Sequence, residues 1–244
     1  MKVLDCVWEI DNIGKKTCEV IISNGDIIDY SFIDNLNLTY NYQVLKVEPG
    51  NVNTILFLQE QGFRLIETQI DVELKYKDFD FDNSLIKYLE QDISFVDVVK
   101  EEDLKLIIDK ITPEMFVSDR ISLDPLFGPV LGCQRYCNWM RTAFRSGSAS
   151  FYQIKFKDEH IGFSMFRIKG GTWHGDLGGI YPSAGQGLGL LTACAPFLYM
   201  KQRGLSVIKL NSSISSNNIP VLSSFNHCRY NFKKFKYIFV KHIN

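Results

Sequence analysis

The sequence predicts a mixed α/β fold, in which helices pack against a central twisted sheet. Three features indicate this. Residues 179–219 read in order as a strand, a glycine-rich loop, a buried helix, a second strand and a helix that begins at an asparagine. Residues 151–168 read as a β-hairpin around a charged turn. A helix, a Gly-Phe pair and a strand follow one another at residues 52–75.

The glycine-rich loop follows a strand that ends at Pro182. Glycines stand at the alternate positions 185, 187 and 189, which lets the backbone approach a ligand closely. The run 188–200 is apolar and of helical length, so we expect a buried helix there. Unpaired N–H groups and the helix dipole favour anions at such a helix start. The donors of this predicted anion site are the backbone N–H groups of Gly187, Leu188 and Gly189.

Two phosphate-binding loops do not match this one. A P-loop needs Lys and then Ser or Thr after its last glycine, whereas Leu190-Leu191 follow here. A dinucleotide fingerprint needs wider glycine spacing and an early βαβ unit. The segment instead resembles strand four, the pyrophosphate loop and helix three of the GCN5-related N-acetyltransferases (GNATs). Two later features match that family, a strand at 205–210 and Asn218-Ile219-Pro220-Val221-Leu222 ahead of an aromatic residue, Phe225.

The resemblance covers residues 95–242 and implies the GNAT fold, whose central mixed sheet is splayed between strands four and five. It implies transfer of acetyl from acetyl-CoA, as co-substrate, to an amine by direct attack in a ternary complex, without a metal. The pantetheine arm would pair with strand edges near 179–181 and 208–212. A backbone N–H on strand four would stabilise the oxyanion. The implied cofactor-binding residues are Gly179, Ile180, Tyr181, Gly185, Gln186, Gly187, Leu188, Gly189 and Asn218.

Two positions depart from the family pattern. Ala184 stands where Arg or Gln is usual, which puts cofactor affinity in question although Gln186 compensates in part. Phe225 stands where many members carry a Tyr as general acid for the leaving thiolate. Tyr230 matches a core Phe of the family, so we expect a buried aromatic side chain there.

For proton removal, the resemblance points to His174, which occupies the position of a strand-four carboxylate in some members. Asp176 follows two residues later and so lies on the same face of the strand. A His–Asp arrangement takes a proton near neutral pH, and we predict these two as the catalytic residues. The alternative is that Trp173-His174-Gly175 is only the edge of a hairpin turn.

The acceptor is predicted from a resemblance at subfamily level. The two-lobed layout and the helix start at Asn218 resemble the sugar-nucleotide acetyltransferases of bacterial surface-polysaccharide pathways, such as the dTDP-fucosamine acetyltransferases. This implies a nucleotide-linked amino sugar, whose diphosphate Arg141 and Arg145 would meet unless they form a solvated face. Two alternatives remain: an acetyltransferase for a small amine, an amino acid or a protein, and a non-catalytic acyl-CoA-binding module, which Ala184 and Phe225 favour.

The first 84 residues predict a partial copy of the same fold. Counting from Asn51, Gly62-Phe63 fall where Arg229-Tyr230 fall counting from Asn218. We therefore expect an N-terminal partial GNAT-like lobe at 1–84, ending in an acidic linker at 78–84, and the acetyltransferase domain at 85–244. A generic helix-strand joint is the alternative.

The other elements follow from hydrophobic periodicity and turn residues. In residues 1–84 we expect strands at 3–10, 17–22, 42–47 and 64–75, and a helix at 52–61. Beyond them we expect strands at 93–99, 151–156, 160–168, 172–181 and 231–242, and helices at 101–110 and 126–144, the latter with Pro129 in its first turn.

Composition limits the class of protein. The 244 residues carry a net charge of −1 and no basic block, which argues against nucleic acid as a partner. The six cysteines show no metal-ligand spacing and predict reduced core thiols in a cytoplasmic protein. The first residues show no signal-peptide pattern, and the longest apolar run is too short to span a bilayer. We expect a monomer or homodimer, without membrane insertion, that acts on a small-molecule amine.

Overall fold

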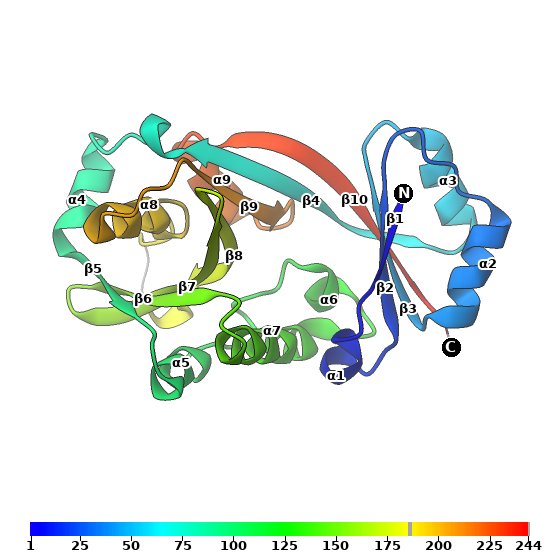
Figure 1. Cartoon of the computed structure of the whole chain (residues 1–244), viewed down its shortest axis with the longest axis horizontal. Coiled ribbons are helices and arrows are strands. Elements are labelled where there is room, and N and C mark those ends of the chain that lie inside the picture. Colours follow the sequence, from blue (N-terminus) through cyan, green and yellow to red (C-terminus); the bar gives the residue numbers. More distant parts are fainter. Residues whose placement is uncertain (185–186, 244) are drawn as a thin grey trace.

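The structure is a computed structural model that describes residues 1–184 and 187–243. Its strands form one ten-stranded sheet in the order β1-β2-β3-β10-β4-β9-β8-β7-β6-β5 (Figure 1). The strands are β1 (Lys2–Asp5), β2 (Thr17–Ile22), β3 (Tyr42–Val47), β4 (Arg64–Lys75), β5 (Ile93–Asp97), β6 (Ser150–Phe156), β7 (Glu159–Lys169), β8 (Thr172–Ile180), β9 (Lys209–Ser215) and β10 (Asn231–His242). The α-helices are α1 (Glu9–Ile13), α2 (Tyr30–Thr39), α3 (Val52–Glu60), α4 (Ser84–Asp92), α5 (Glu101–Ile108), α6 (Arg120–Leu123), α7 (Gly128–Arg145), α8 (Leu191–Arg203) and α9 (Ile219–His227).

The sheet is mixed, as predicted. The pairs β2–β3 and β8–β9 are parallel, and the other neighbouring strands are antiparallel. Helices α4, α8 and α9 bury one apolar face of the sheet, and α5 and α7 bury the other. At the other end of the sheet, α2 and α3 pack over β2 and β3 (Figure 1).

Three consecutive elements recur along the chain at a constant distance. The first residues of β3, α3 and β4 precede those of β9, α9 and β10 by 167 residues in every case, as Tyr42 and Lys209 show. Each helix has an Asn N-cap, Asn51 or Asn218. Gly62 and Arg229, which follow the two helices, both have a positive φ, 81° and 60°. The two stretches therefore share element spacing and backbone conformation, and the partial duplication stays a prediction.

The two segments exchange strands. Strand β4, from the first segment (residues 1–84), lies between β9 and β10, and β10, from the second segment (residues 85–244), lies between β3 and β4. The β4–β10 register places Gln69 opposite Lys236, and these two positions are also 167 residues apart. The pairing is therefore symmetric about this point, so each segment completes the other's part of the sheet.

Two predicted elements near the N-terminus need correction. Residues 3–10 are not one strand, because β1 ends at Asp5 and α1 begins at Glu9, whose side chain is fully buried against other helices. The expected linker at 78–84 leads directly into α4, which Asn83 caps by accepting hydrogen bonds from two backbone N–H groups.

The helix and strand after the glycine-rich loop are also shifted. Helix α8 begins at Leu191 rather than Leu188, after a turn in which Leu191 N–H donates to the Leu188 carbonyl. It continues to Arg203 and ends at Gly204, whose φ of 61° only glycine adopts without strain. Because residues 205–208 form the connection after this cap, β9 starts at Lys209 instead of residue 205.

All six cysteines are buried and free, as predicted. Within the described ranges no helix is long and apolar enough to cross a membrane, and no group of three His, Cys, Asp or Glu side chains is placed to hold a metal.

Candidate functional site

An opening in the sheet lies where β8 and β9 separate. Their parallel pairing ends at Gly175 and Ser212, although β8 continues to Ile180 and β9 to Ser215. A cavity of about 700 Å³ passes between them and reaches both faces of the sheet. This is the splay that the sequence predicted between strands four and five.

A β-bulge at Asp176 accompanies this separation. The β7–β8 register pairs Met165 with Leu177 and Phe166 with Gly175, which leaves Asp176 without a partner. An extra residue of this kind bends its strand and increases the local twist. The bulge therefore turns the end of β8 away from β9 and opens the cavity.

The open edge of β8 offers backbone groups to a ligand. Tyr181 N–H donates to the Ile161 carbonyl on β7 at 2.7 Å. Because backbone direction alternates along a strand, the N–H and C=O groups of Gly178 and Ile180 point the other way, toward the opening. A Cβ at Gly178 would lie 2.9 Å from the Phe163 carbonyl oxygen, so this position needs glycine. Sequence reasoning named Gly179, Ile180 and Tyr181 but missed Gly178.

The loop before α8 forms one end of the cavity. Gly187 has a φ of 92°, which requires glycine, and the Gly189 carbonyl accepts from the Thr192 hydroxyl at 2.7 Å and from Ser224 at 3.2 Å. Gly189 and Thr192 line the cavity, whereas Leu188 packs against the core. The predicted Gly185 and Gln186 lie outside the described residues.

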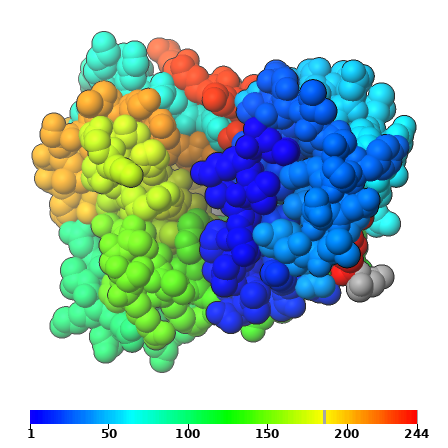
Figure 2. Space-filling view, turned by 45° about the vertical axis from the view of Figure 1, so that its right-hand side comes forward, coloured from blue at the N-terminus to red at the C-terminus, as the bar shows by residue number. Residues whose placement is uncertain are grey.

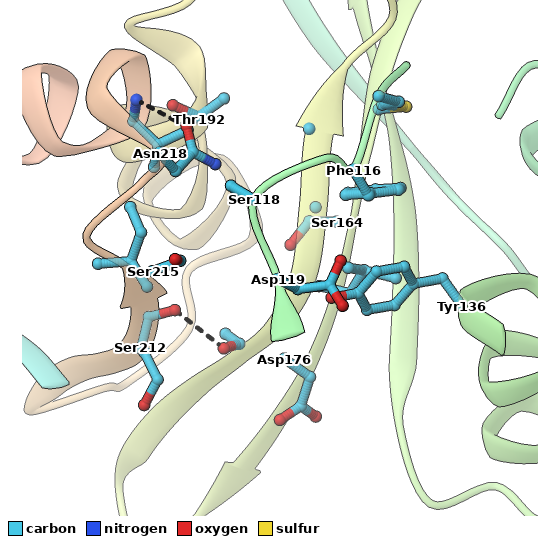
Figure 3. A pocket seen from close by; sticks show the side chains of 18 of the residues that line it. Phe116, Ser118, Asp119, Tyr136, Ser164, Asp176, Thr192, Ser212, Ser215 and Asn218 are labelled. Atoms are coloured by element: carbon cyan, nitrogen blue, oxygen red, sulfur yellow. Dashed lines mark hydrogen bonds between the residues drawn. The ribbon is translucent and has the colours of Figure 1, made fainter. Parts of the chain in front are cut away.

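Asn218 lines the same part of the cavity as the N-cap of α9. Its Oδ1 accepts from Val221 N–H at 3.3 Å. Figure 3 shows Asn218 and Thr192 on one wall of the cavity, with Phe116 and Tyr136 on the opposite wall.

The predicted catalytic residues do not interact as a His–Asp pair. Both carboxylate oxygens of Asp176 accept from Arg167, each at 2.6 Å. His174 lies opposite Arg167 in the β7–β8 register and lines a second pocket of about 650 Å³. Asp176 lines both pockets, whereas the residues that line the main cavity do not include His174. Their proposed catalytic role stays a prediction.

The aromatic residues at and near the position of the expected general acid pack in the hydrophobic core. Phe225 and Tyr230 are both buried, with rings 4.5 Å apart. The Tyr230 hydroxyl donates to the Ala193 carbonyl at 2.8 Å, and burial holds its pKa well above the ordinary value. Tyr230 is therefore the buried, satisfied aromatic residue that the sequence predicted.

The wall of the cavity beyond the sheet is aromatic and charged. Phe116 and Tyr136 have ring centroids 4.8 Å apart, and Trp139 follows one helical turn after Tyr136. Glu67 of β4 and Asp119, the N-cap of α6, line the same wall. Sequence reasoning found none of these acidic residues, because they come together only after β4 has inserted beside β9.

Two arginines of this wall are held by a buried carboxylate from the first segment. Glu9 is fully buried, and its carboxylate accepts from Arg120 at 3.0 Å and from Arg135 at 2.6 Å. In the space-filling view, the dark blue N-terminal chain lies directly against the green part of the second segment (Figure 2). The contact between α1 and α7 therefore joins the two segments beside the cavity.

Three buried donors on the cavity wall are left without protein partners. Trp173 Nε1, Arg120 Nε and the Tyr152 hydroxyl have no hydrogen-bond partner among the described residues. Buried donors are seldom left unpaired, so these three indicate a polar occupant of the cavity, solvent or ligand. The arginines that the sequence offered for a diphosphate lie elsewhere, since Arg141 donates to Asn138 and Arg145 to Glu101 on exposed surface.

Comparison with known proteins identifies the fold. No protein-family model and no curated protein matches the sequence. Among solved structures, a functionally unknown conserved protein from Staphylococcus epidermidis has a TM-score of 0.60 at 11% identity, over 93% of this chain and 84% of that one. A GCN5-related N-acetyltransferase from Sphaerobacter thermophilus has a TM-score of 0.56 at 12% identity, over 87% and 64% of the two chains. The chain has the GNAT fold. A tandem GNAT protein from the clavulanic acid biosynthesis pathway also shares it, with a TM-score of 0.54 at 10% identity over 93% and 75% of the chains.

Proposed function

We propose that this GNAT-fold protein is an acyl-CoA-dependent N-acyltransferase that moves acetyl from acetyl-CoA to a primary amine in a ternary complex. The observation that carries the proposal is the unpaired edge of β8 beyond Gly175, which faces a cavity open to both sides of the sheet. A pantetheine arm is an extended chain with amide groups, and such chains add to open strand edges. The N–H groups of Gly178 and Ile180 would bind that arm and the oxyanion.

Direct attack on the thioester also agrees with the cysteines. Burial raises the pKa of Cys228 to about 12 and raises that of Cys194 still further. Neither thiol is therefore a ready nucleophile, and the proposed reaction needs no acyl-enzyme.

Calorimetric titration of acetyl-CoA into the protein, with CoA as second ligand, tests the proposal. Micromolar binding, about −8 kcal/mol, is expected. Gly178→Val should abolish it, because its side chain would meet the Phe163 carbonyl oxygen and displace the β8 edge from β7. Gly50→Val, at an exposed turn with a φ of 92° and outside the residues that line the cavity, is the control for lost stability alone. If acetyl-CoA does not bind at millimolar concentration, the assignment is wrong. If it binds but no amine is turned over, the non-catalytic acyl-CoA-binding alternative holds instead.

A nucleotide-linked amino sugar remains the acceptor that the sequence resemblance implies. It is tested by thiol release with a dTDP-linked amino sugar and with the corresponding free amino sugar. If the nucleotide gives no gain in kcat/KM over the free sugar, this acceptor should be dropped.

A further inference from the structure

The cavity wall beyond the sheet contains one carboxylate whose direction is fixed by strand register. Glu67 on β4 lies opposite Ile238 on β10, and directly paired residues share a face of the sheet. Ile238 is buried in a cluster with Ile121 of α6. Glu67 therefore points toward α6, into the part of the cavity across the sheet from α8 and α9.

The Glu67 carboxylate forms no ion pair among the described residues. No Lys, Arg or His nitrogen within the described ranges lies within 4.0 Å of its carboxylate, whereas Arg120 nearby is held by Glu9 at 3.0 Å. Burial raises the pKa of Glu67, and the Ser215 hydroxyl and the charge of Arg120 offset only part of this effect. A partly buried carboxylate that lacks a counter-ion is a natural site for a positively charged ligand.

The other charges on the wall leave the cavity acidic. Lys46 is paired with Glu19 at 2.9 Å, and Arg120 and Arg135 share Glu9. Asp119 accepts from two backbone N–H groups and the Ser122 hydroxyl. Every basic side chain named here is thus already ion-paired, with only Arg120 Nε lacking a partner, and the local field favours a cation over a phosphate or carboxylate.

An apolar surface stands next to this carboxylate. The rings of Phe116 and Tyr136 are 4.8 Å apart and those of Tyr136 and Trp139 are 6.4 Å apart. Trp139 is 36% exposed, so this surface opens to solvent. Aromatic faces attract ammonium groups and pack against apolar rings. The wall thus matches a molecule with an amine at one end and an uncharged ring at the other.

We propose that Glu67, supplied by the first segment, binds the acceptor's ammonium group and takes its proton, and that the acceptor is a small amine with an uncharged, ring-containing body and no phosphate or carboxylate. This inference rests on the proposed acetyl transfer and names its acceptor class, which takes the place of the nucleotide-linked amino sugar implied by the sequence resemblance. It gives the first segment a part in the chemistry as well as in the sheet.

The ammonium R–NH₃⁺ gives one proton to the Glu67 carboxylate and becomes R–NH₂. The nitrogen lone pair forms a C–N bond to the thioester carbonyl carbon, and the C–S bond breaks as the carbonyl reforms. The second nitrogen proton goes to the departing CoA thiolate, and Glu67 releases its proton to water. The products are R–NH–CO–CH₃, CoA–SH and H⁺.

The test compares two amines that differ by one charge, benzylamine and 4-(aminomethyl)benzoate, in a thiol-release assay with acetyl-CoA. We expect benzylamine to give a kcat/KM at least tenfold higher. Glu67→Gln should lower kcat/KM for benzylamine by about 10²–10⁴-fold while leaving acetyl-CoA affinity unchanged. Glu73→Gln is the matched control, because Glu73 lies on the same strand and is paired with Lys209 at 2.6 Å. It should stay within about twofold of wild type.

The pH dependence separates chemistry from structural support. Wild-type kcat/KM should fall toward acid pH as Glu67 becomes protonated, and this dependence should be lost in Glu67→Gln. Equal turnover of both amines, or a Glu67→Gln variant that keeps the wild-type rate and acid limb, would overturn the proposal.

Calorimetry with benzylamine alone tests the role of Glu67 in acceptor binding independently of acetyl transfer. Wild type should bind benzylamine at least tenfold more tightly than Glu67→Gln does. Absence of this difference refutes the role of Glu67 even where acetyl-CoA binds, whereas loss of acetyl-CoA binding alone refutes only the proposed function.

Discussion

Replacing Glu9 by Gln tests how the two segments are joined. Glu9 is 0% exposed, and its carboxylate neutralises Arg120 and Arg135, whose side chains are 16% and 15% exposed. Gln keeps the size of the side chain but removes its charge. Two guanidinium groups then lie close together, largely buried, without a counter-ion.

The size of the effect follows from this burial. Removing one partner of a buried ion pair typically costs about 3–5 kcal/mol. At this chain length each kcal/mol corresponds to about 2–4 °C, so the melting temperature should fall by roughly 6–20 °C. The matched control is Glu101→Gln, whose carboxylate meets Arg145 at a site where both side chains are more than 60% exposed. An exposed pair of this kind contributes about 0–1 kcal/mol.

Thermal unfolding followed by far-UV circular dichroism, at pH 7 and at several lower pH values, measures both variants. Burial by itself raises the pKa of Glu9, but the hydrogen bonds and charges of Arg135 and Arg120 outweigh it and lower the pKa. The stabilisation by Glu9 is thus present above the unfolded Glu pKa of about 4.3 and is lost as pH falls through the lower folded pKa. The gap between wild type and Glu9→Gln should close in that acid range. If Glu9→Gln is as stable as Glu101→Gln at pH 7, the buried network does not join the segments.

Four further substitutions have definite expected outcomes. Glu67→Gln should raise the melting temperature at pH 7, because burial raises the pKa of Glu67 and its charged form therefore destabilises the fold above that pKa. Differential scanning calorimetry should show this gain in melting temperature shrinking toward pH 4. A gain that stays constant with pH would contradict this reasoning. Gly178→Ala should lower the free energy of unfolding by about 1–3 kcal/mol in urea titration, because its Cβ would crowd the β7 backbone at 2.9 Å. Gly187→Ala should destabilise the fold through its φ of 92° and leave the edge of β8 intact. Tyr230→Phe should cost about 1 kcal/mol through the lost bond to Ala193 and leave kcat within about threefold; a hundredfold fall would make Tyr230 the general acid.

The sequence predicted most strands and the long helices because their signals are local. The ranges expected for β2, β3, β4 and β10 match the structure residue for residue. In these strands β-branched and aromatic residues are concentrated and turn residues mark the ends. Helix α1 was missed because it is held by tertiary contacts, with Glu9 buried between two arginines. Helix α6 is a four-residue turn fixed by the Asp119 cap and gives no periodic signal.

The candidate site was predictable only where it follows one stretch of chain. The strand-loop-helix at 172–203 and the cap at Asn218 could be located from residue order alone. Glu67 could not be found in this way, because it meets the cavity only through the pairing of Gln69 with Ser215, residues far apart in sequence. The bulge at Asp176 could not be predicted from the sequence either. With this bulge, the Asp176 carboxylate accepts a hydrogen bond from Arg167 and not from His174.

Strand exchange leads to a final prediction about the two segments. Residues 85–244 alone would lack β4, which leaves the edge of β9 opposite β8 unpaired along Lys209–Ser215 and leaves β10 with neither of its neighbours. Long unpaired edges of this kind promote aggregation. We therefore expect the 85–244 fragment to be insoluble or oligomeric in size-exclusion chromatography. Co-expression with residues 1–84 should restore a 1:1 complex, because each fragment then supplies the strand that the other lacks.

A soluble, monomeric 85–244 fragment with the melting temperature of the whole chain would contradict this reasoning. It would mean that β9 and β10 close the sheet without β4, so that the exchange observed here contributes little to stability. Acetyl-CoA binding by such a fragment would then separate the two roles of the first segment. If the fragment binds acetyl-CoA but acetylates benzylamine no faster than Glu67→Gln does, the first segment is needed for the acceptor and dispensable for the fold.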